Sequence, residues 1–538
     1  MPLEDLRGRV AIVTGASSGI GRSTCVALAR EGVHLVVVGR DVARLTQTVA
    51  LAKMSGGAGL QTLALALDVR SEADMQVMAS RTLDAFGRID ILVHSAGILR
   101  AAGSSLRTLA QLPASDWDEV VDINLRGTFL ANRAVLPAMV AARRGDILNL
   151  SSKSGRAGIA FDAPYCASKF GVIGMSEAVA DEVRHFGVRV QVLAPGRFDT
   201  EVLQQTGPLP HPGGIPPPER VADAIVWMLS MPADTRLLTP IIDPLDTQAM
   251  AGWPAGRPPP QRVLHSSSTS KELSMSTANS WRRQDLTGKV VIVSGGTGGI
   301  GLATAQAVAE LGASVVVADI NAERVASVAA EIGAAAPGGC LGVPIDVRLE
   351  QDHARLVQAT LERFGRIDAL VVCAGILRKR GTPPKVLVDV ETDEWDDVMA
   401  INLKGVFLAN RAVLPTMIAQ RSGTIINLSS VQGLQGRAYD GPYCASKFGV
   451  IGLSQAVADE VRTYGVKVQA LMPAAVATPM WEQNLPAPMP GDAIPPERVA
   501  DLIVFMLLQP EDTMVVGPVI APVGARKRRA AGGPARTA

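Results

Sequence analysis

The sequence is poor in residues that mark several protein classes. Only five of its 538 residues are cysteine, and aromatic side chains make up 4%. The cysteines lie far apart and form no Cys-x-x-Cys pair, which argues against a disulfide framework and a zinc site and fits a reducing compartment. We therefore expect a cytoplasmic chain without a metal centre.

Net charge and long apolar runs are also lacking. The 52 basic and 51 acidic residues nearly cancel, so no strong field steers the chain toward nucleic acid or an anionic membrane. No run of eighteen apolar residues predicts a membrane span. A strand-like segment begins at Val10, which leaves no room for a signal peptide before it. The expected partner is a small molecule.

The chain does contain a repeat of domain size. Residues 123–137 recur at 401–415 with two changes, and residues 164–174 recur unchanged at 442–452. A period of about 280 residues indicates a duplicated domain, because solenoid repeats are far shorter.

The repeat predicts four segments. They are an N-terminal domain over 1–250, a linker over 251–283, a C-terminal domain over 284–524 and a basic tail over 525–538. The linker is rich in proline and serine. For the tail, a solvated disordered segment is favoured over a targeting signal.

Strand-like and helix-like segments alternate within each copy. In the first copy the strand-like segments are Val10–Thr14, His34–Gly39, Leu63–Asp68, Ile89–Ser95, Asp146–Ser151 and Arg189–Ala194. Helical stretches lie between them, and the longest are expected over 115–142 and 164–186. This alternation predicts an α/β fold with two tandem Rossmann-like, doubly wound parallel sheets flanked by helices.

A glycine-rich turn follows the first strand of each copy. Residues 14–21 read Thr-Gly-Ala-Ser-Ser-Gly-Ile-Gly, and residues 294–301 read Ser-Gly-Gly-Thr-Gly-Gly-Ile-Gly. Such a turn lets the backbone approach a pyrophosphate, and the following helix offers free N–H groups to the anion. A flexible turn would explain one cluster, but two at strand-to-helix junctions favour a dinucleotide site.

The end of the second strand predicts which dinucleotide each copy binds. Asp319 ends that strand in the second copy, where a carboxylate accepts ribose hydroxyls and repels a 2′-phosphate. Gly39 and Arg40 occupy the equivalent place in the first copy and suit a 2′-phosphate. We expect NADP(H) in the N-terminal half and NAD(H) in the C-terminal half. The alternatives are a solvated loop arginine for Arg40 and a helix N-cap for Asp319.

A tyrosine and a lysine lie four residues apart on one predicted helix face in each copy. In the first copy they are Tyr165 and Lys169, and Ser152 ends a strand thirteen residues earlier. A nearby ammonium should lower the tyrosine pKa, so that the pair moves a proton to or from a substrate oxygen. A lone Tyr-x-x-x-Lys is usually a surface pair, but the second copy repeats the whole set. Its members are Ser430, Tyr443 and Lys447.

Together these motifs resemble the short-chain dehydrogenase/reductase family, particularly its 3-oxoacyl-carrier-protein-reductase-like members. The resemblance covers almost all of both copies and leaves out the linker and tail. It implies NAD(P)-dependent hydride transfer between a nicotinamide and a ketone or secondary alcohol. It also implies that the tyrosines act as acid and base and the serines orient substrate, while the lysines bind ribose and acidify the tyrosines. Asn124 and Asn402 match the family asparagine that holds a proton-relay water.

The resemblance also implies a set of cofactor-binding residues in each half. Asp68 and Asp346 would meet the adenine, and Thr200 and Thr478 would lie near the carboxamide. In the N-terminal half the expected set is Gly15, Ser17, Gly19, Ile20, Gly21, Arg40, Asp68, Val69, Ala96, Gly97, Pro195 and Thr200. In the C-terminal half it is Gly295, Gly299, Ile300, Gly301, Asp319, Asp346, Val347, Ala374, Gly375, Pro473 and Thr478.

The sequence departs from the family pattern at two points. The family's two asparagines after the fourth strand are replaced in both copies, and His94 at that point is interpreted as a packed strand-end residue. The glycine after Pro195 becomes Ala474 in the second copy, where a methyl group would crowd the nicotinamide pocket. The segments after Thr200 and Thr478 are mainly apolar and predict lids over a small, largely apolar ketone or secondary alcohol.

Three functional hypotheses follow. The favoured one is an oxidoreductase with two sites. In the alternative, only the N-terminal half is catalytic and the C-terminal half is a packing or cofactor-sensing partner. A dinucleotide sensor without turnover is the third. Because the helices over 115–142 and 164–186 are nearly duplicated, we also expect the halves to pack as an intrachain pseudo-dimer, and two chains to pair further as a homodimer.

Overall fold

The computed structural model describes residues 4–201, 215–232, 235, 239–242, 285–484 and 489–521. The expected linker over 251–283 and tail over 525–538 lie outside these residues, as does most of the expected lid after Thr200. No helix in the described ranges is long and apolar enough to cross a membrane.

Each half contains one seven-stranded parallel sheet. The strands of the N-terminal half are β1 Val10–Thr14, β2 His34–Gly39, β3 Thr62–Ala66, β4 Ile91–His94, β5 Gly145–Leu150, β6 Val188–Pro195 and β7 Ile241–Ile242. Those of the C-terminal half are β8 Val290–Ser294, β9 Ser314–Asp319, β10 Cys340–Pro344, β11 Ala369–Val372, β12 Gly423–Leu428, β13 Val466–Pro473 and β14 Val519–Ile520. Their spatial orders are β3-β2-β1-β4-β5-β6-β7 and β10-β9-β8-β11-β12-β13-β14. The predicted doubly wound α/β fold is confirmed.

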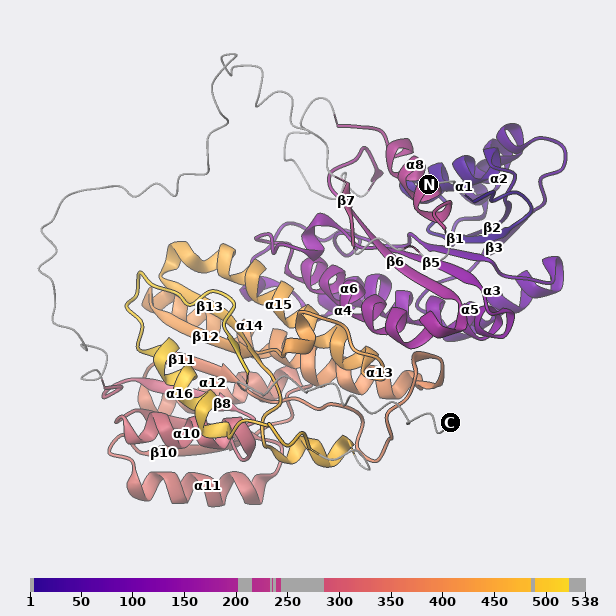
Figure 1. Cartoon of the computed structure of the whole chain (residues 1–538). Helices are drawn as coiled ribbons and strands as arrows, with labels where there is room; N and C mark the ends of the chain where they lie inside the picture. Colours follow the sequence, from indigo (N-terminus) through magenta and orange to yellow (C-terminus); the bar gives the residue numbers. More distant parts are fainter. Residues whose placement is uncertain are drawn as a thin grey trace, which may run out of the picture.

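Helices cover both faces of each sheet (Figure 1). In the N-terminal half they are α1 Gly19–Arg30, α2 Val42–Gly56, α3 Glu72–Phe86, α4 Ala114–Val121, α5 Gly127–Ala142, α6 Ala163–Val183 and α8 Glu219–Leu229. In the C-terminal half they are α10 Gly299–Glu310, α11 Ala322–Ala335, α12 Glu350–Phe364, α13 Thr392–Met399, α14 Gly405–Gln420, α15 Gly441–Val461 and α16 Pro496–Leu507. Helices α1, α2 and α8 pack on one face of the first sheet, and α3 to α6 pack on the other. Because both faces of each sheet are covered, the strands are rich in valine, isoleucine and leucine and do not alternate between apolar and polar residues.

The helix expected over 115–142 and its duplicate over 393–420 are each interrupted by one wide turn. A π-helical segment, η2 Asp122–Arg126, separates α4 from α5, and η7 Ala400–Lys404 separates α13 from α14. Wide turns of this kind inside a helix often occur at functional sites. Periodicity alone predicted continuous helices here because the π turn leaves the flanking apolar pattern intact.

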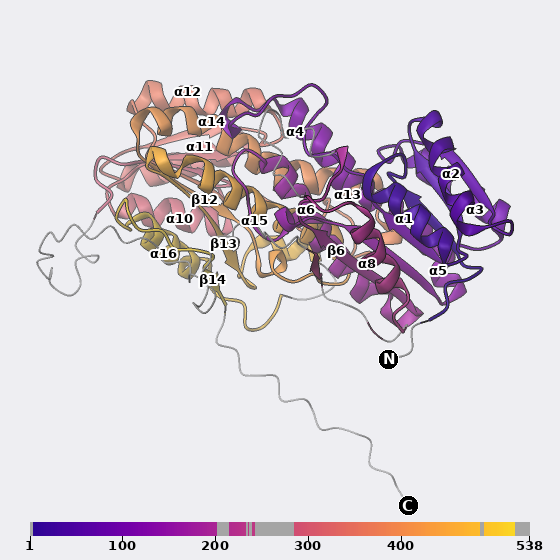
Figure 2. The same cartoon turned by 90° about the horizontal axis from the view of Figure 1, so that it is seen from above.

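The two halves contact each other through α6 and α15, which lie between the sheets in both views (Figures 1 and 2). Glycines permit the close approach of these helices. A Cβ on Gly174 would lie 2.4 Å from the ring of Phe448, and one on Gly452 would lie 2.5 Å from Phe170. Nearly every position of α6 is buried, since one side faces its own sheet and the other faces α15.

Reciprocal aromatic stacks and ion pairs flank this helix contact. Trp117 of α4 stacks on Phe407 of α14 with ring centroids 4.3 Å apart, and Phe129 stacks on Trp395 at the same distance. Lys404 Nζ lies 2.7 Å from a carboxylate oxygen of Asp118 in the other half. Trp117 and Phe129 lie 278 residues before Trp395 and Phe407, so each aromatic stack has an equivalent produced by the sequence repeat.

Candidate active sites

The glycine-rich turn between β1 and α1 is shaped by two close backbone approaches. Gly15 has φ of +64°, and a Cβ there would lie 2.7 Å from the backbone nitrogen of Ala96. A Cβ on Gly21 would lie 2.3 Å from the carbonyl oxygen of Gly15. Ser18, the N-cap of α1, makes no side-chain capping bond. The helix therefore keeps N–H groups available for an anion.

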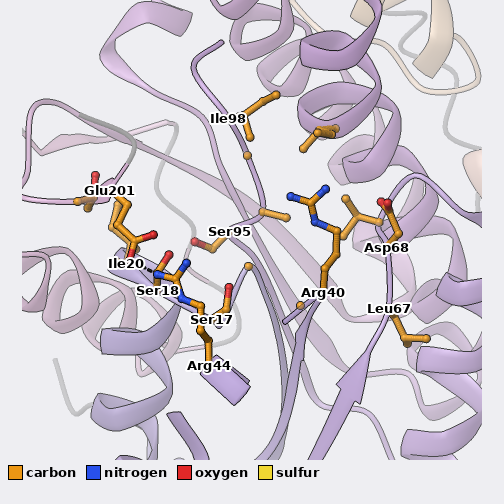
Figure 3. Close-up of a pocket in the computed structure, with 18 residues that line it drawn as sticks. Ser17, Ser18, Ile20, Arg40, Arg44, Leu67, Asp68, Ser95, Ile98 and Glu201 are labelled. Carbon is orange, nitrogen blue, oxygen red and sulfur yellow. Dashed lines mark hydrogen bonds and ion pairs between the residues drawn. The ribbon is translucent and has the colours of Figure 1, made fainter. Parts of the chain in front are cut away.

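The turn opens onto a cavity of about 280 Å³ at the point where the strand order reverses between β1 and β4 (Figure 3). Doubly wound sheets bind their ligands at this position. Most of the cofactor residues expected in the N-terminal half line it: Gly15, Ser17, Gly19, Ile20, Arg40, Asp68, Val69, Ala96, Gly97 and Thr200. Gly21 lies beneath the turn and Pro195 ends β6, so these two are not lining residues.

Two arginines face this cavity, and only one was expected. Arg40 is exposed, and Figure 3 shows its guanidinium beside Asp68. The carboxylate of Asp68 accepts hydrogen bonds from Arg70, whose guanidinium holds the pKa of Asp68 below its usual range. Arg44, which sequence reasoning missed, pairs with Glu201 beside the glycine-rich turn. Nothing in the sequence pattern links residues 44 and 201, because the contact is tertiary.

Asp319 occupies the position equivalent to Gly39 and is already engaged. One carboxylate oxygen accepts hydrogen bonds from the backbone N–H of Thr297 at 3.2 Å and from its hydroxyl at 2.7 Å. The N-cap of α11 is Asn321, so the alternative interpretation of Asp319 as that cap is wrong. Asp346 pairs with Arg348 at 2.6 Å, as Asp68 does with Arg70.

The acid-base residues expected in the N-terminal half lie close together near the start of α6. Lys169 donates from Nζ to the carbonyl of Leu150 at 2.9 Å and lies 5.7 Å from the ring centroid of Tyr165. Burial lowers the pKa of Lys169 to about 8. Burial also raises the pKa of Tyr165 to about 12, although a hydrogen bond with Ser152 opposes the rise. This shift is opposite to the lowering expected from Lys169, because desolvation of the phenolate dominates.

Asn124 lies in the π turn η2, and its side chain makes three hydrogen bonds. Its Oδ1 accepts from the Ile98 N–H at 2.8 Å, and its Nδ2 donates to the Ile98 carbonyl at 2.8 Å and to the Ser168 hydroxyl at 3.0 Å. A Cβ on Gly97 would lie 3.1 Å from Asn124 Oδ1 and 3.3 Å from Lys169 Nζ. Because Gly97 has no side chain, both Asn124 Oδ1 and Lys169 Nζ can lie close to its backbone.

The C-terminal half repeats this geometry. Lys447 Nζ donates to the carbonyl of Leu428 at 2.9 Å and lies 5.5 Å from the ring centroid of Tyr443. Asn402 donates to the Ile376 carbonyl at 2.7 Å. Burial raises the pKa of Tyr443, and Ser430 hydrogen-bonds to it.

The remaining expected residues of the C-terminal half fall into equivalent places. The tight contacts of Gly295, Gly299 and Gly301 match those of the first turn, and Ile300 packs against the neighbouring core. A Cβ on Gly375 would lie 3.2 Å from Asn402, and Thr478 lies against Gly299. Ala374 adjoins Gly295, and Val347 adjoins Gly405. Pro473 adjoins Ser430. Ala474 has no left-handed backbone, so alanine fits there without strain.

His94, at the end of β4, is a neutral packed residue. Its Nδ1 lies 3.0 Å from the Thr14 hydroxyl. Burial, assisted by the Lys169 charge, lowers the pKa of His94 to about 3. No group of three metal-ligating side chains occurs in the part of the chain described here.

A largely buried ion pair lies near each tyrosine and was missed by sequence reasoning. Arg100 lies 2.5 Å from Asp162 in the N-terminal half, and Arg378 lies 2.5 Å from Asp440 in the C-terminal half. Both aspartates immediately precede the helix that carries the tyrosine. The expected lid segments after Thr200 and Thr478 gave no signal for these ion pairs, because the arginines lie elsewhere in the chain, after β4 and β11.

Comparisons with known proteins match both halves. The model of the short chain dehydrogenase family matches residues 9–209 and 289–488. The chain is 26% identical to a peroxisomal hydratase-dehydrogenase-epimerase of Neurospora crassa over 94% of this chain and 58% of that protein. It is 37% identical to 3-oxoacyl-(acyl-carrier-protein) reductase FabG of Thermotoga maritima over 44% of this chain and 96% of that protein. The chain thus spans little more than half the length of the Neurospora relative.

One solved structure extends the comparison. It is a metagenomic short-chain oxidoreductase in complex with NADP, 31% identical, with a TM-score of 0.39. The match covers 45% of this chain and 99% of that one.

Proposed function

Because the chain belongs to the short chain dehydrogenase family and is an oxidoreductase, we propose that it carries two catalytic sites, one in each half. Each site transfers hydride between a nicotinamide and a ketone or secondary alcohol. The observation that carries the proposal is the near-identical arrangement of Asn, Ser, Tyr and Lys in both halves. The hydrogen bonds of the asparagines and lysines agree between the halves to about a tenth of an ångström, which argues against a degenerate C-terminal half.

A dinucleotide fits the residues of each half. A side chain at the close-packed glycines of the turn would clash with neighbouring backbone, so the turn stays open to a ligand. The first N–H groups of the following helix have no side-chain cap and favour a pyrophosphate. When bound, the nicotinamide supplies or accepts the hydride. We propose NADP(H) in the N-terminal half, held by Arg40 with the nearby Arg44, and NAD(H) in the C-terminal half, held by Asp319.

The chain's own residues then manage the proton. With its pKa raised to about 12, Tyr165 is protonated at neutral pH and donates its phenol proton to the oxygen of a ketone. Lys169 stabilises the phenolate that remains, and Ser152 orients the substrate oxygen beside the phenol. Asn124 fixes the backbone at Ile98 and positions the water that returns the proton. In oxidation each proton moves the other way.

The halves form the proposed pseudo-dimer through α6, α15 and the flanking aromatic stacks. A homodimer would use a different surface, for which Trp227 and Phe505 are equivalent exposed candidates on α8 and α16. The domain limits proposed for the two units remain 1–250 and 284–524. They contain the two segments that match the family.

We propose a 3-oxoacyl thioester as the substrate class, in keeping with the name of the Thermotoga relative. The test is a steady-state assay of the full chain with NADPH or NADH and a panel of ketones that includes acetoacetyl-CoA. Turnover that depends on the carbonyl compound is expected. Binding of both dinucleotides without turnover of any panel member would instead favour a dinucleotide sensor.

A further inference from the structure

Glu182 lies near the end of α6 but serves the other half of the chain. Its side chain is 3% exposed. One carboxylate oxygen accepts from the backbone N–H of Leu387 at 2.8 Å, and the other accepts from that of Tyr439 at 2.9 Å. Both bonds cross from the N-terminal to the C-terminal half, and neither helps to build the N-terminal site.

Glu460 makes the reciprocal contact from α15. Its Oε1 accepts from the backbone N–H of Leu109 at 2.7 Å. Burial raises the Glu460 pKa, a rise that the Leu109 and Phe161 N–H groups oppose, yet Oε2 makes no hydrogen bond within the described residues. Glu460 therefore accepts one firm hydrogen bond from the N-terminal half, where Glu182 accepts two from the C-terminal half.

The backbone that these carboxylates hold is strained and adjoins the catalytic tyrosines. Tyr439 and Phe161 have φ of +67° and +68°, in a region that residues with side chains rarely adopt. Such a conformation persists only where its surroundings enforce it. The next residue is Asp440 in one half and Asp162 in the other, each ion-paired to an arginine and three residues before the tyrosine.

The held segment also forms part of a small pocket whose lining extends to Pro442, the residue before Tyr443. Arg378, Tyr439, Asp440 and Pro442 line it, together with residues that follow β11. Tyr443 and Lys447 are fixed separately, because they lie within α15 and Lys447 is held by the Leu428 carbonyl. Release of Tyr439 should thus loosen the substrate side of the site and leave the proton-moving pair in place.

We propose that Glu182 is a positioning residue of the C-terminal site and Glu460 a positioning residue of the N-terminal site, so that each site is completed by the other half. This inference rests on the proposed function, since it presumes that substrate binds beside the tyrosines. A hydrogen bond between a backbone N–H and a charged group is strong enough for its loss to change substrate binding about tenfold or more.

The test crosses two sets of variants in the full chain. Tyr165→Phe leaves only the C-terminal site active, and Tyr443→Phe leaves only the N-terminal site. Glu182→Gln should raise KM for acetoacetyl-CoA at the C-terminal site about tenfold, with kcat within about twofold, and leave the N-terminal site unchanged. Glu460→Gln should do the reverse. Measurements at pH 8 keep Glu182 ionised, because burial raises its pKa to about 7.

Asp181→Asn is the matched control, because it removes a carboxylate from the preceding position on α6, where the one ion pair of Asp181 within the described residues is with Arg184 at the surface. Glu182→Asp keeps the charge but shortens the reach, and it should rescue KM in part. Unchanged KM at the C-terminal site, or a rise at the N-terminal site, would overturn the inference.

Amide hydrogen exchange gives a second readout that needs no substrate. Glu182→Gln should speed exchange in segments 386–388 and 438–440 at least tenfold over Asp181→Asn and leave segments 108–110 and 160–162 unchanged. If the wild-type chain does not turn over acetoacetyl-CoA, that substrate assignment fails separately and the exchange rates decide the inference. Exchange equal to that of the control would then refute it.

Discussion

Replacing Arg40 by alanine should weaken NADPH binding by the N-terminal half without weakening the fold. Arg40 is exposed, lines the cavity and makes no hydrogen bond or ion pair within the residues described here. Surface substitutions of this kind usually change the free energy of unfolding by less than about 0.5 kcal/mol. A loss of affinity would therefore report the contact with the 2′-phosphate itself.

The size of the expected loss follows from that contact. A hydrogen bond between charged groups contributes about 1.5–3 kcal/mol, and each 1.4 kcal/mol is a tenfold change in affinity. Roughly tenfold to a hundredfold weaker NADPH binding is expected, nearer tenfold because solvent screens the exposed guanidinium. NADH lacks the phosphate, so its affinity should not change.

Fluorescence titration of the full chain with NADPH and NADH measures both affinities. Arg44→Ala is the comparison variant, because Arg44 lines the same cavity but is paired to Glu201, so its loss should weaken NADPH binding less than the loss of Arg40. NADPH binding by Arg40→Ala at wild-type strength would show that Arg40 is a solvated loop residue. If both halves of the native chain strongly prefer the same dinucleotide, the cofactor preference predicted from the end of the second strand is wrong.

Three further outcomes are expected. Trp117→Ala removes a buried stack between the halves and should lower the free energy of unfolding by about 3–5 kcal/mol; a loss under 1 kcal/mol in denaturant titration would contradict this. Burial raises the pKa of Glu182 and Glu460 from 4.5 to about 7, so the stability they contribute is complete below pH 4.5 and is lost as pH rises to 7. Denaturant titrations from pH 5 to 8 should show this fall, and Glu182→Gln should flatten it; an equal slope in the variant would count against it. Asn124→Ala should lower kcat at the N-terminal site at least tenfold with NADPH affinity retained, and unchanged kcat would exclude Asn124 from the proton path.

Much of the fold and the candidate sites could be predicted because the relevant signals are local. The turn at residues 14–21 joins a strand to a helix, and Tyr165 and Lys169 are one helical turn apart. Duplication adds weight, since a chance pattern would not recur intact 278 residues later. Six strands of the N-terminal half were predicted within a few residues for the same reason: each is a short apolar segment between breakers. The two-residue strands β7 and β14 were not predicted, because they are too short to show a pattern.

Contacts between distant segments could not be predicted. The pair Arg44–Glu201 and the hydrogen bond from the Tyr439 N–H to Glu182 join residues with no shared periodicity. The π turn around Asn124 also gave no signal, because one extra residue per turn leaves the apolar pattern readable as a normal helix. The pKa of Tyr165 was expected in the wrong direction, since the sequence shows the nearby lysine but not the depth of burial.

The central claim is that one chain holds two complete catalytic sites. The most direct measurement compares carbonyl-dependent turnover in the full chain for Tyr165→Phe, Tyr443→Phe and the double variant. Loss of a general acid lowers turnover by about 10²–10⁴-fold, so each single variant should retain the activity of its intact half. The double variant should retain almost none while still binding nicotinamide dinucleotide. Full loss in one single variant with no effect of the other would leave one catalytic half, and turnover by the double variant would contradict the tyrosine assignment altogether.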